Sequence, residues 1–262
     1  MNSKIKKFLI KKSHELISIL IAITLWEYIA IYIVKNEMFL PPFSTILLAF
    51  FDVVNTGIVF IDIKISLMHF LLGLVSAILI GVPIGLVVGW FDIANAFLNP
   101  LIQIIRPIPP LAWIPFALLW FGLTPLAAGF IVFIGAIFPI IINTYSGVKS
   151  VPIVYIEAAK ILECRSNLKL IWNIVLPSAL PSIASGIRIA MGVGWMCIVA
   201  AEMFGVSTHG LGEKIHWHGF LFRMDYTFMY MLVLGFVGLF IDWAFKYFID
   251  NYFLKWQKGV VA

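Results

Sequence analysis

Few polar residues in this sequence have types and spacing that could support chemistry. His216 and His218 lie two positions apart, with His209 nearby, and imidazole nitrogens are common metal ligands. No carboxylate cluster accompanies them, so we expect no metal site. The pair Lys149-Ser150 ends the string GVKS, which lacks the glycine spacing of a phosphate-binding loop. We therefore expect no catalytic residue, no metal and no cofactor in this chain.

An intramembrane enzyme would need a nucleophile beside a base, or a set of metal ligands, within its apolar blocks. His69 is the one histidine in its block, and Cys197 has no evident histidine partner. Cys164, the other of the two cysteines, lies in a polar segment, so no disulfide framework is indicated. Enzymatic activity is therefore a minor alternative.

The composition indicates a protein whose solvent is mostly lipid. Of 262 residues, 62% are hydrophobic and 12% are charged, whereas soluble domains carry about 25% charged residues. The net charge of +5 is not concentrated on a soluble module, which argues against nucleic-acid binding. We expect an all-α, multi-pass protein of the cell membrane.

Six apolar blocks approach the length of about 20 residues that a helix needs to cross a bilayer. An even number of crossings places both termini on the same side of the membrane. The predicted spans are 16–34, 66–90, 97–121, 126–145, 179–204 and 228–249.

Lysine and arginine residues then select the orientation, because they favour cytoplasmic loops. Twelve lie in the N-terminal segment 1–12, between the fourth and fifth spans, and at the C-terminal end, against four on the opposite side. Both termini are therefore predicted to be cytoplasmic. We divide the chain into a first span with an outer interfacial segment (1–61), a transmembrane core (62–250) and a cytoplasmic tail (251–262).

Glycines and prolines mark two spans as unusual. Gly81, Gly85 and Gly89 share one face of the second span, so a neighbouring backbone can approach closely. The third span contains the string RPIPP at 106–110, which cannot continue an unbroken helix. Such a break either faces a protein-lined transport path or is a kink between a short interfacial helix, 96–105, and the true span.

The polar segment 150–177 interrupts two long apolar blocks and reads as two short helices. Pro152 suits a first helical turn, with Ser150 as a possible cap. Glu157 lies near the positive end of the first helix, where a carboxylate is favourable. Ala158 and Ala159 are small, so the surface of a partner protein could approach the backbone closely and bind this cytoplasmic segment.

This segment resembles the signature loop of ABC importer permeases. The string EAA at 157–159 is followed at the family's distance by IVLP at 174–177 and then by ALP at 179–181. In that family the loop forms a coupling helix that docks on a separate ATPase. The family usually has glycine at the position of Glu163, so the turn is expected either to follow a longer first helix or to lie at Ser166-Asn167.

Other strings resemble the nitrate, taurine and alkanesulfonate subgroup of that family. They are FLPP at 39–42, RPIPPLAWIP at 106–115, WFG at 120–122, GVGW at 192–195 and AAE at 200–202. Together they extend from the first outer segment to the last span. The resemblance implies a permease for a small solute, such as nitrate, taurine or an alkanesulfonate.

The resemblance also implies partners. They are a cytoplasmic dimer of ATP-binding subunits that holds ATP and Mg, an extracytoplasmic solute-binding protein, and a second permease copy in the surrounding lipid. The residues expected to couple the permease to the ATPase are Glu157, Ala158, Ala159, Lys160, Leu162 and Glu163.

Two arginines are the charges most expected at membrane depth. If they face the path, they would favour an anion, whereas the alternative is a structural ion pair or a headgroup contact. A neutral or heterocyclic solute, and transport driven by an ion gradient through a few intramembrane acids, are the alternative functions. The candidate path residues are Arg106, Pro109, Trp113, Arg188, Trp195 and Glu202.

Overall fold

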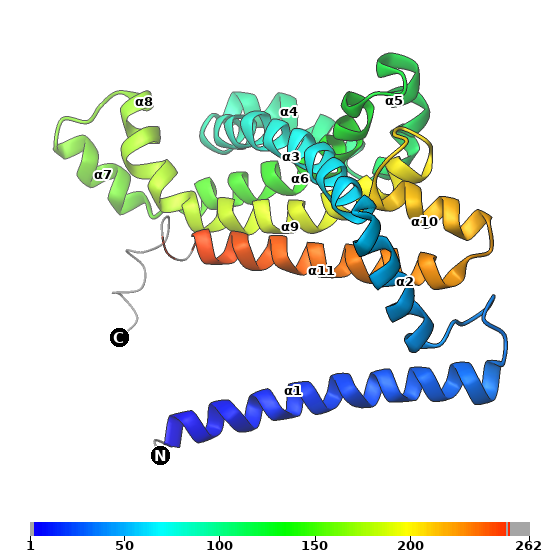
Figure 1. The fold of residues 1–262 in the computed structure, drawn as a ribbon. Helices are drawn as coiled ribbons and strands as arrows, with labels where there is room; N and C mark the ends of the chain where they lie inside the picture. The colour runs from blue at the N-terminus through cyan, green and yellow to red at the C-terminus, as the bar shows by residue number, and fades with distance from the viewer. Residues whose placement is uncertain (1–2, 250, 252–262) are drawn as a thin grey trace. The chain divides into compact units, whose positions relative to one another are not determined.

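The computed structural model describes residues 3–249 and 251, with the side chains of 12–249 and 251. The regular secondary structure of this part of the chain is helical, and it contains no strand (Figure 1). Five helices are long and apolar enough to cross a membrane, and one bent pair of helices makes a sixth candidate. The predicted all-α membrane fold with about six spans is therefore confirmed.

The candidate spans overlap all six predicted ones. The bent pair counts as one crossing because Lys149, at the end of the next helix, α6 (Pro125–Lys149), bonds to Asp92 at the start of the pair, with Nζ and Oδ1 3.3 Å apart. The chain must therefore cross and return between these two residues. The candidates are Lys12–Val34, Ile58–Trp90, Asp92–Ile105 with Pro110–Phe121, Pro125–Lys149, Asn167–Met203 and Met224–Phe248.

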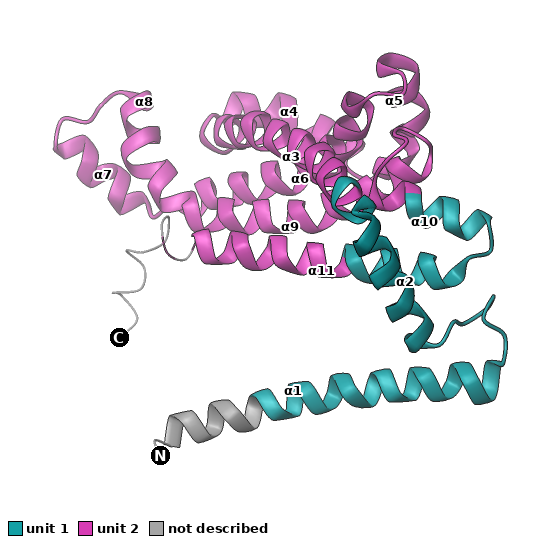
Figure 2. Ribbon diagram, viewed as in Figure 1, with its two compact units in different colours: residues 1–61, 214–234 teal, residues 62–213, 235–262 magenta. Residues whose placement is uncertain are grey.

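The chain divides into two compact units, which Figure 2 shows in different colours. The first contains residues 1–61 and 214–234, and the second contains residues 62–213 and 235–262. The predicted cytoplasmic tail lies outside the described residues except for Asn251.

In the first unit, α1 (Ser3–Tyr28) continues as a π-helical turn, Ile29–Val34, and is followed by α2 (Phe43–Thr56). Glu27 holds the start of α2, because its carboxylate accepts hydrogen bonds from the Ser44 hydroxyl at 2.7 Å and the Ser44 backbone N–H at 3.2 Å. Glu27 therefore supplies the oxygens that cap the start of α2. Trp26 also packs edge-on against Phe228, with 5.3 Å between ring centroids.

The second unit is built around α6 (Pro125–Lys149), which supplies the largest share of its buried residues. The glycine face of α3 (Ile58–Trp90) packs directly on α6. A Cβ atom added at Gly85 would lie 2.5 Å from Thr144 Cβ, and one added at Gly89 would lie 2.7 Å from Val148 Cβ. The predicted close approach at these glycines is therefore confirmed.

The helix that follows the polar segment begins earlier than predicted. α8 (Asn167–Leu170), the π-helical turn Ile171–Val175 and α9 (Leu176–Met203) form one continuous candidate span. Proline normally interrupts a helix because it lacks an N–H group and clashes with the preceding turn. Here the π-helical turn shifts the hydrogen bonding just before Pro177, with Leu176 N–H bonded to Ile171 O. The predicted start at residue 179 is therefore too late.

The other helices of the second unit position its two ends. α4 (Asp92–Ile105) and α5 (Ile114–Phe121) precede α6, and α7 (Ile153–Ile161) follows it. In Figure 1, α7 and α8 lie at one end of this unit and α5 at the other. α10 (Leu211–Phe220) and α11 (Met224–Phe248) each run from one unit into the other.

Candidate functional site

The proline-rich string at 106–110 separates α4 from a 3₁₀ turn, Pro110–Trp113, that leads into α5. The two halves are bent by 90°. Neither half alone reaches the length of about 20 residues that a crossing needs. The predicted break of the helix at these prolines is therefore confirmed.

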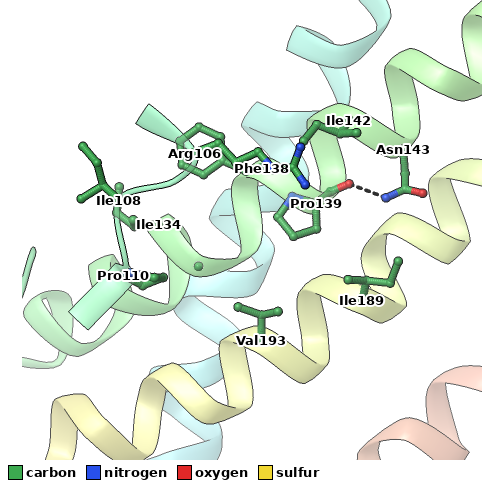
Figure 3. Close-up of a pocket in the computed structure, with 11 residues that line it drawn as sticks. Arg106, Ile108, Pro110, Ile134, Phe138, Pro139, Ile142, Asn143, Ile189 and Val193 are labelled. Atoms are coloured by element: carbon green, nitrogen blue, oxygen red, sulfur yellow. Dashed lines mark hydrogen bonds between the residues drawn. The ribbon is translucent and has the colours of Figure 1, made fainter. Parts of the chain in front are cut away.

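The break lines a cavity of about 320 Å³ together with α6 and α9 (Figure 3). Arg106 enters this lining from the end of α4, while Ile189 and Val193 line it from α9. On α6, Asn143 donates an amide N–H to Pro139 O at 2.8 Å. This bond fixes the Asn143 side chain at the cavity wall.

Arg106 is the charged residue in this lining. Within the described part of the chain, no ion pair or side-chain hydrogen bond involves its guanidinium group. A guanidinium has five N–H donors in a planar fork that suits carboxylate-like and other oxyanion groups. The cavity therefore offers an unpaired cationic group beside a mostly apolar wall.

Three other predicted path residues do not line this cavity. Pro109 precedes the 3₁₀ turn, and Trp113 packs against the hydrophobic core beside it. Trp195 packs edge-on against Phe70, with 5.3 Å between ring centroids, and lies close to Gly238 of α11. These tryptophans therefore have packing contacts within the second unit.

Arg188 forms a structural ion pair, which was one of the alternatives that the sequence analysis gave for it. Its Nε and one terminal nitrogen donate to the two carboxylate oxygens of Asp242, each at 2.7 Å. Both side chains are about half exposed, at 49% and 46%. This fork joins α9 to α11 and leaves Arg106 as the arginine at the cavity.

Glu202 is also absent from the cavity lining and is 1% exposed. Its carboxylate accepts hydrogen bonds from the Ser66 hydroxyl and the Gly212 backbone N–H, both at 2.9 Å. His69 Nδ1 lies 3.1 Å from its second oxygen. Glu202 is thus paired within the protein, near the end of α9 remote from α7.

One of the three histidines at 209–218, His218, takes part in aromatic packing. In the first unit, His218 stacks on Tyr226 and Tyr230, with centroid distances of 4.9 and 5.7 Å. Within the described residues, no group of three or more His, Cys, Asp and Glu side chains could hold a metal ion.

The predicted coupling segment contains α7, which Pro152 precedes as the N-cap residue. Ser150 does not cap it, because its hydroxyl donates to Gly147 O at 2.8 Å. Glu157, Ala158 and Lys160 are exposed, whereas Ala159 is buried within the chain itself. The helix therefore presents one face outward and packs the Ala159 face on its own protein.

α7 ends in a left-handed turn at Glu163, whose φ is +64°. The Glu163 N–H bonds to Lys160 O at 3.2 Å, and the Cys164 N–H bonds to Ala159 O at 3.0 Å. These two bonds define a Schellman motif, in which the left-handed position usually holds glycine. The expectation of a displaced turn is therefore wrong: the turn lies at Glu163 despite the side chain.

Apolar side chains around this turn were largely missed by sequence reasoning. Leu162 was named, and it is 81% exposed, but Ile161 is 82% exposed beside it. Ile153, Val154 and Tyr155 are exposed at the start of the same helix. The available signal was their occurrence in a segment predicted to lie in the cytoplasm, where no lipid covers them.

Membrane-crossing helices around a cavity with an arginine in its lining, and an exposed helical segment at one end, fit a membrane transport subunit. Residues 77–252 match the family described as binding-protein-dependent transport system inner membrane component. The chain belongs to this family and is a permease subunit of an ABC importer.

Two relatives match the sequence of this chain over most of their length. A Methanocaldococcus jannaschii protein, described as a candidate ABC transporter permease, is 40% identical over 242 residues, which cover 91% of this chain and 90% of that protein. The taurine transport system permease protein TauC of Escherichia coli K12 is 30% identical over 227 residues, which cover 85% and 82%. The predicted family and its subgroup are therefore confirmed.

The fold also resembles a solved structure. A chain of the MetNI methionine ABC transporter, in an inward-facing conformation, superposes with a TM-score of 0.66. The match covers 75% of this chain and 96% of that chain, at 19% identity. Membership of the family sets aside the ion-gradient transporter and the intramembrane enzyme, and it confirms a multi-pass location in the inner membrane.

Proposed function

We propose that this permease imports a small anion and that Arg106 selects for it. The observation that carries the proposal is the unpaired guanidinium of Arg106 in the cavity formed by the broken span, α6 and α9 (Figure 3). The Arg106 side chain is exposed, so a solute that enters the cavity can reach its guanidinium group. An anion in the cavity would supply the missing counter-charge.

The position of Arg106 at the C-terminal end of α4 does not remove the preference of the cavity for an anion. A helix C-terminus carries a partial charge of about −0.5, which a cation offsets. The guanidinium carries a full positive charge, so a net attraction for an anion remains. Pro139 and Asn143 bond to each other across the cavity wall and do not provide a carboxylate.

The solute class is also supported by the relatives. TauC is named for taurine, which carries a sulfonate group. A sulfonate or nitrate has the planar or trigonal arrangement of oxygens that a guanidinium binds with two parallel hydrogen bonds. A neutral or heterocyclic solute would gain little from this group.

The motor of the transporter is assigned to partner subunits. α7 exposes apolar side chains that an ATPase dimer would cover on the cytoplasmic face, and ATP and Mg would bind there. Residues 62–250 would form the transmembrane core, paired with a second permease copy. A solute-binding protein would deliver the anion from outside. Nucleotide-driven closure of the ATPase dimer would then move α7 and shift the permease between two arrangements.

The test is transport by the complete complex in proteoliposomes, with its ATPase subunits and its binding protein. Labelled taurine, nitrate, methanesulfonate and a neutral pyrimidine are the probes. We expect ATP-dependent uptake of one anion, reduced more than tenfold by Arg106→Gln and less by Arg106→Lys, which keeps the positive charge but not the two parallel hydrogen bonds.

Arg223→Gln is the matched control, because Arg223 lies outside the cavity and stacks on Tyr226, with its guanidinium carbon 4.0 Å from the ring centroid. Uptake of the pyrimidine alone, or anion uptake that Arg106→Gln leaves unchanged, would contradict the proposed selectivity. Absence of any ATP-dependent uptake would contradict the assignment of the motor.

A further inference from the structure

Four polar side chains are fully buried at the end of the core remote from α7. Asp62 and Ser66 are 0% exposed, and His69 and Glu202 are 1% exposed. The first three lie on α3 and the fourth on α9. Burying carboxylates is costly unless donors satisfy them. The groups that donate hydrogen bonds to these side chains therefore show which segment the cluster binds.

The donors are three successive backbone N–H groups. Gly210 N donates to Asp62 Oδ1 at 3.2 Å, Leu211 N donates to Ser66 Oγ at 2.9 Å, and Gly212 N donates to Glu202 Oε2 at 2.9 Å. Ser66 in turn donates its hydroxyl hydrogen to Glu202. The cluster thus binds the main chain of residues 210–212, which are the last residue of the loop after α9 and the first two residues of α10. We call residues 204–212 the outer loop.

Two glycines make this attachment possible. A Cβ atom at Gly210 would lie 2.6 Å from the Glu202 carboxyl carbon, and one at Gly212 would lie 2.4 Å from Val199 O. Gly210 also has a φ of +142°, a conformation that other residues rarely adopt. The close approach of residues 210–212 to the cluster therefore requires glycine at positions 210 and 212.

The attached loop presents side chains outward. Phe204 is 63% exposed, Thr208 is exposed, and the His209 side chain is 45% exposed, with Nδ1 3.4 Å from Asp62. α9 runs from the coupling segment to this loop, so its end lies on the extracytoplasmic side if α7 is cytoplasmic. A soluble binding protein approaches from that side.

We propose that Glu202, with Asp62 and Ser66, is a positioning residue that holds the outer loop as a preformed surface for the solute-binding protein. The inference rests on the proposed function, since it requires delivery by a binding protein. A surface ordered before binding avoids the entropy that a mobile loop would lose on contact. Weakening the cluster therefore lowers the affinity for the binding protein and leaves the nucleotide-driven cycle intact.

The variants are Glu202→Gln and the milder Ser66→Ala, which removes the acceptor of one loop N–H. Asp92→Asn is the matched acid-to-amide control, because the Asp92 side chain is 93% exposed and bonds to Lys149 outside the cluster. Each complex, with its ATPase subunits in lipid nanodiscs, is titrated with its binding protein while ATP hydrolysis is followed. Hydrogen–deuterium exchange of residues 206–213 is measured in parallel.

For both cluster variants we expect about a tenfold higher half-saturating concentration of binding protein, with maximal and unstimulated rates within about twofold of wild type. Amide exchange should accelerate about tenfold or more at Gly212 in Glu202→Gln and at Leu211 in Ser66→Ala, because each variant weakens or removes the acceptor of that N–H group. The Asp92→Asn complex should match wild type in all these readouts.

The outcomes separate the two proposals. A wild-type complex that the binding protein does not stimulate would overturn the proposed function and this inference with it. Stimulation with an unchanged half-saturating concentration in both variants would overturn the inference alone. A reduced maximal rate at unchanged half-saturation would also overturn it, because the cluster would then act in the cycle and not in docking.

Discussion

α9 begins beside the coupling segment and ends at the buried cluster of Asp62, Ser66, His69 and Glu202. The two ends differ in which kind of side chain is exposed to solvent and which is buried. Near its start, Ile161 and Leu162 expose more than four-fifths of their surface, at 82% and 81%. Near its end, Asp62 and Glu202 are buried, at 0% and 1% exposure. The coupling end exposes apolar groups, whereas the outer end encloses charged ones.

The difference indicates two kinds of attachment. Exposed apolar side chains gain about 1.5–3 kcal/mol each when a partner covers them, so they suit a contact that forms between subunits. Buried carboxylates are stable only with their donors in place, so they suit a permanent join within the chain. The continuous helix of residues 167–203 connects the two attachments.

Glu202→Ala should have the largest effect, because it removes the acceptor for Ser66, His69 and Gly212 together. Breaking a buried charged network costs about 3–5 kcal/mol, which lowers the melting temperature of a chain of this size by about 10 °C. Thermal unfolding in detergent, followed by tryptophan fluorescence, measures the change.

Glu157→Ala is the control for that measurement, because Glu157 is exposed on α7 at the opposite end of the core. Equal melting temperatures for the two variants would remove the contrast between the ends.

Leu162→Glu should affect assembly without affecting the fold. Placing a charge in a contact that buries leucine should weaken binding of the ATPase subunit about 10- to 100-fold, while the melting temperature of the permease stays unchanged. Titration of the detergent-solubilised permease with labelled ATPase subunit measures the affinity.

Asn55→Glu provides the matched control, since it adds the same charge at an exposed position of α2. Glu157→Arg, which reverses the charge on α7, tests the same surface. If Leu162→Glu binds the ATPase as tightly as Asn55→Glu does, the exposed apolar end is not the docking surface.

The spans could be predicted because hydrophobic length decides them, but their ends could not. α3 starts at Ile58, before the predicted residue 66, because Asp62 and Lys64 continue the helix although they are polar. Asp62 is buried there against the backbone of Gly210, 148 positions away. A partner so distant in the sequence gives no local signal.

Two proline-containing segments also show that the sequence alone does not fix where a helix ends. The string at 106–110 was correctly predicted to break its helix, because closely spaced prolines remove several donors. The fifth span was predicted to start at residue 179, after Pro177, yet the π-helical turn Ile171–Val175 carries the helix through this proline. Composition alone does not show which prolines the neighbouring backbone can accommodate.

The smallest effect is expected at Glu163, where a side chain occupies a left-handed position at the coupling end. Non-glycine residues cost about 1 kcal/mol in this conformation, so Glu163→Gly should raise the melting temperature by a few degrees. Glu157→Gly is the matched control, because the same substitution inside α7 should destabilise it by about 0.5–1 kcal/mol. Opposite signs for the two glycine variants would establish the turn at Glu163. A lower melting temperature for both would mean that α7 continues through this position, and the coupling end would then lack the defined turn that sets it apart from the outer loop.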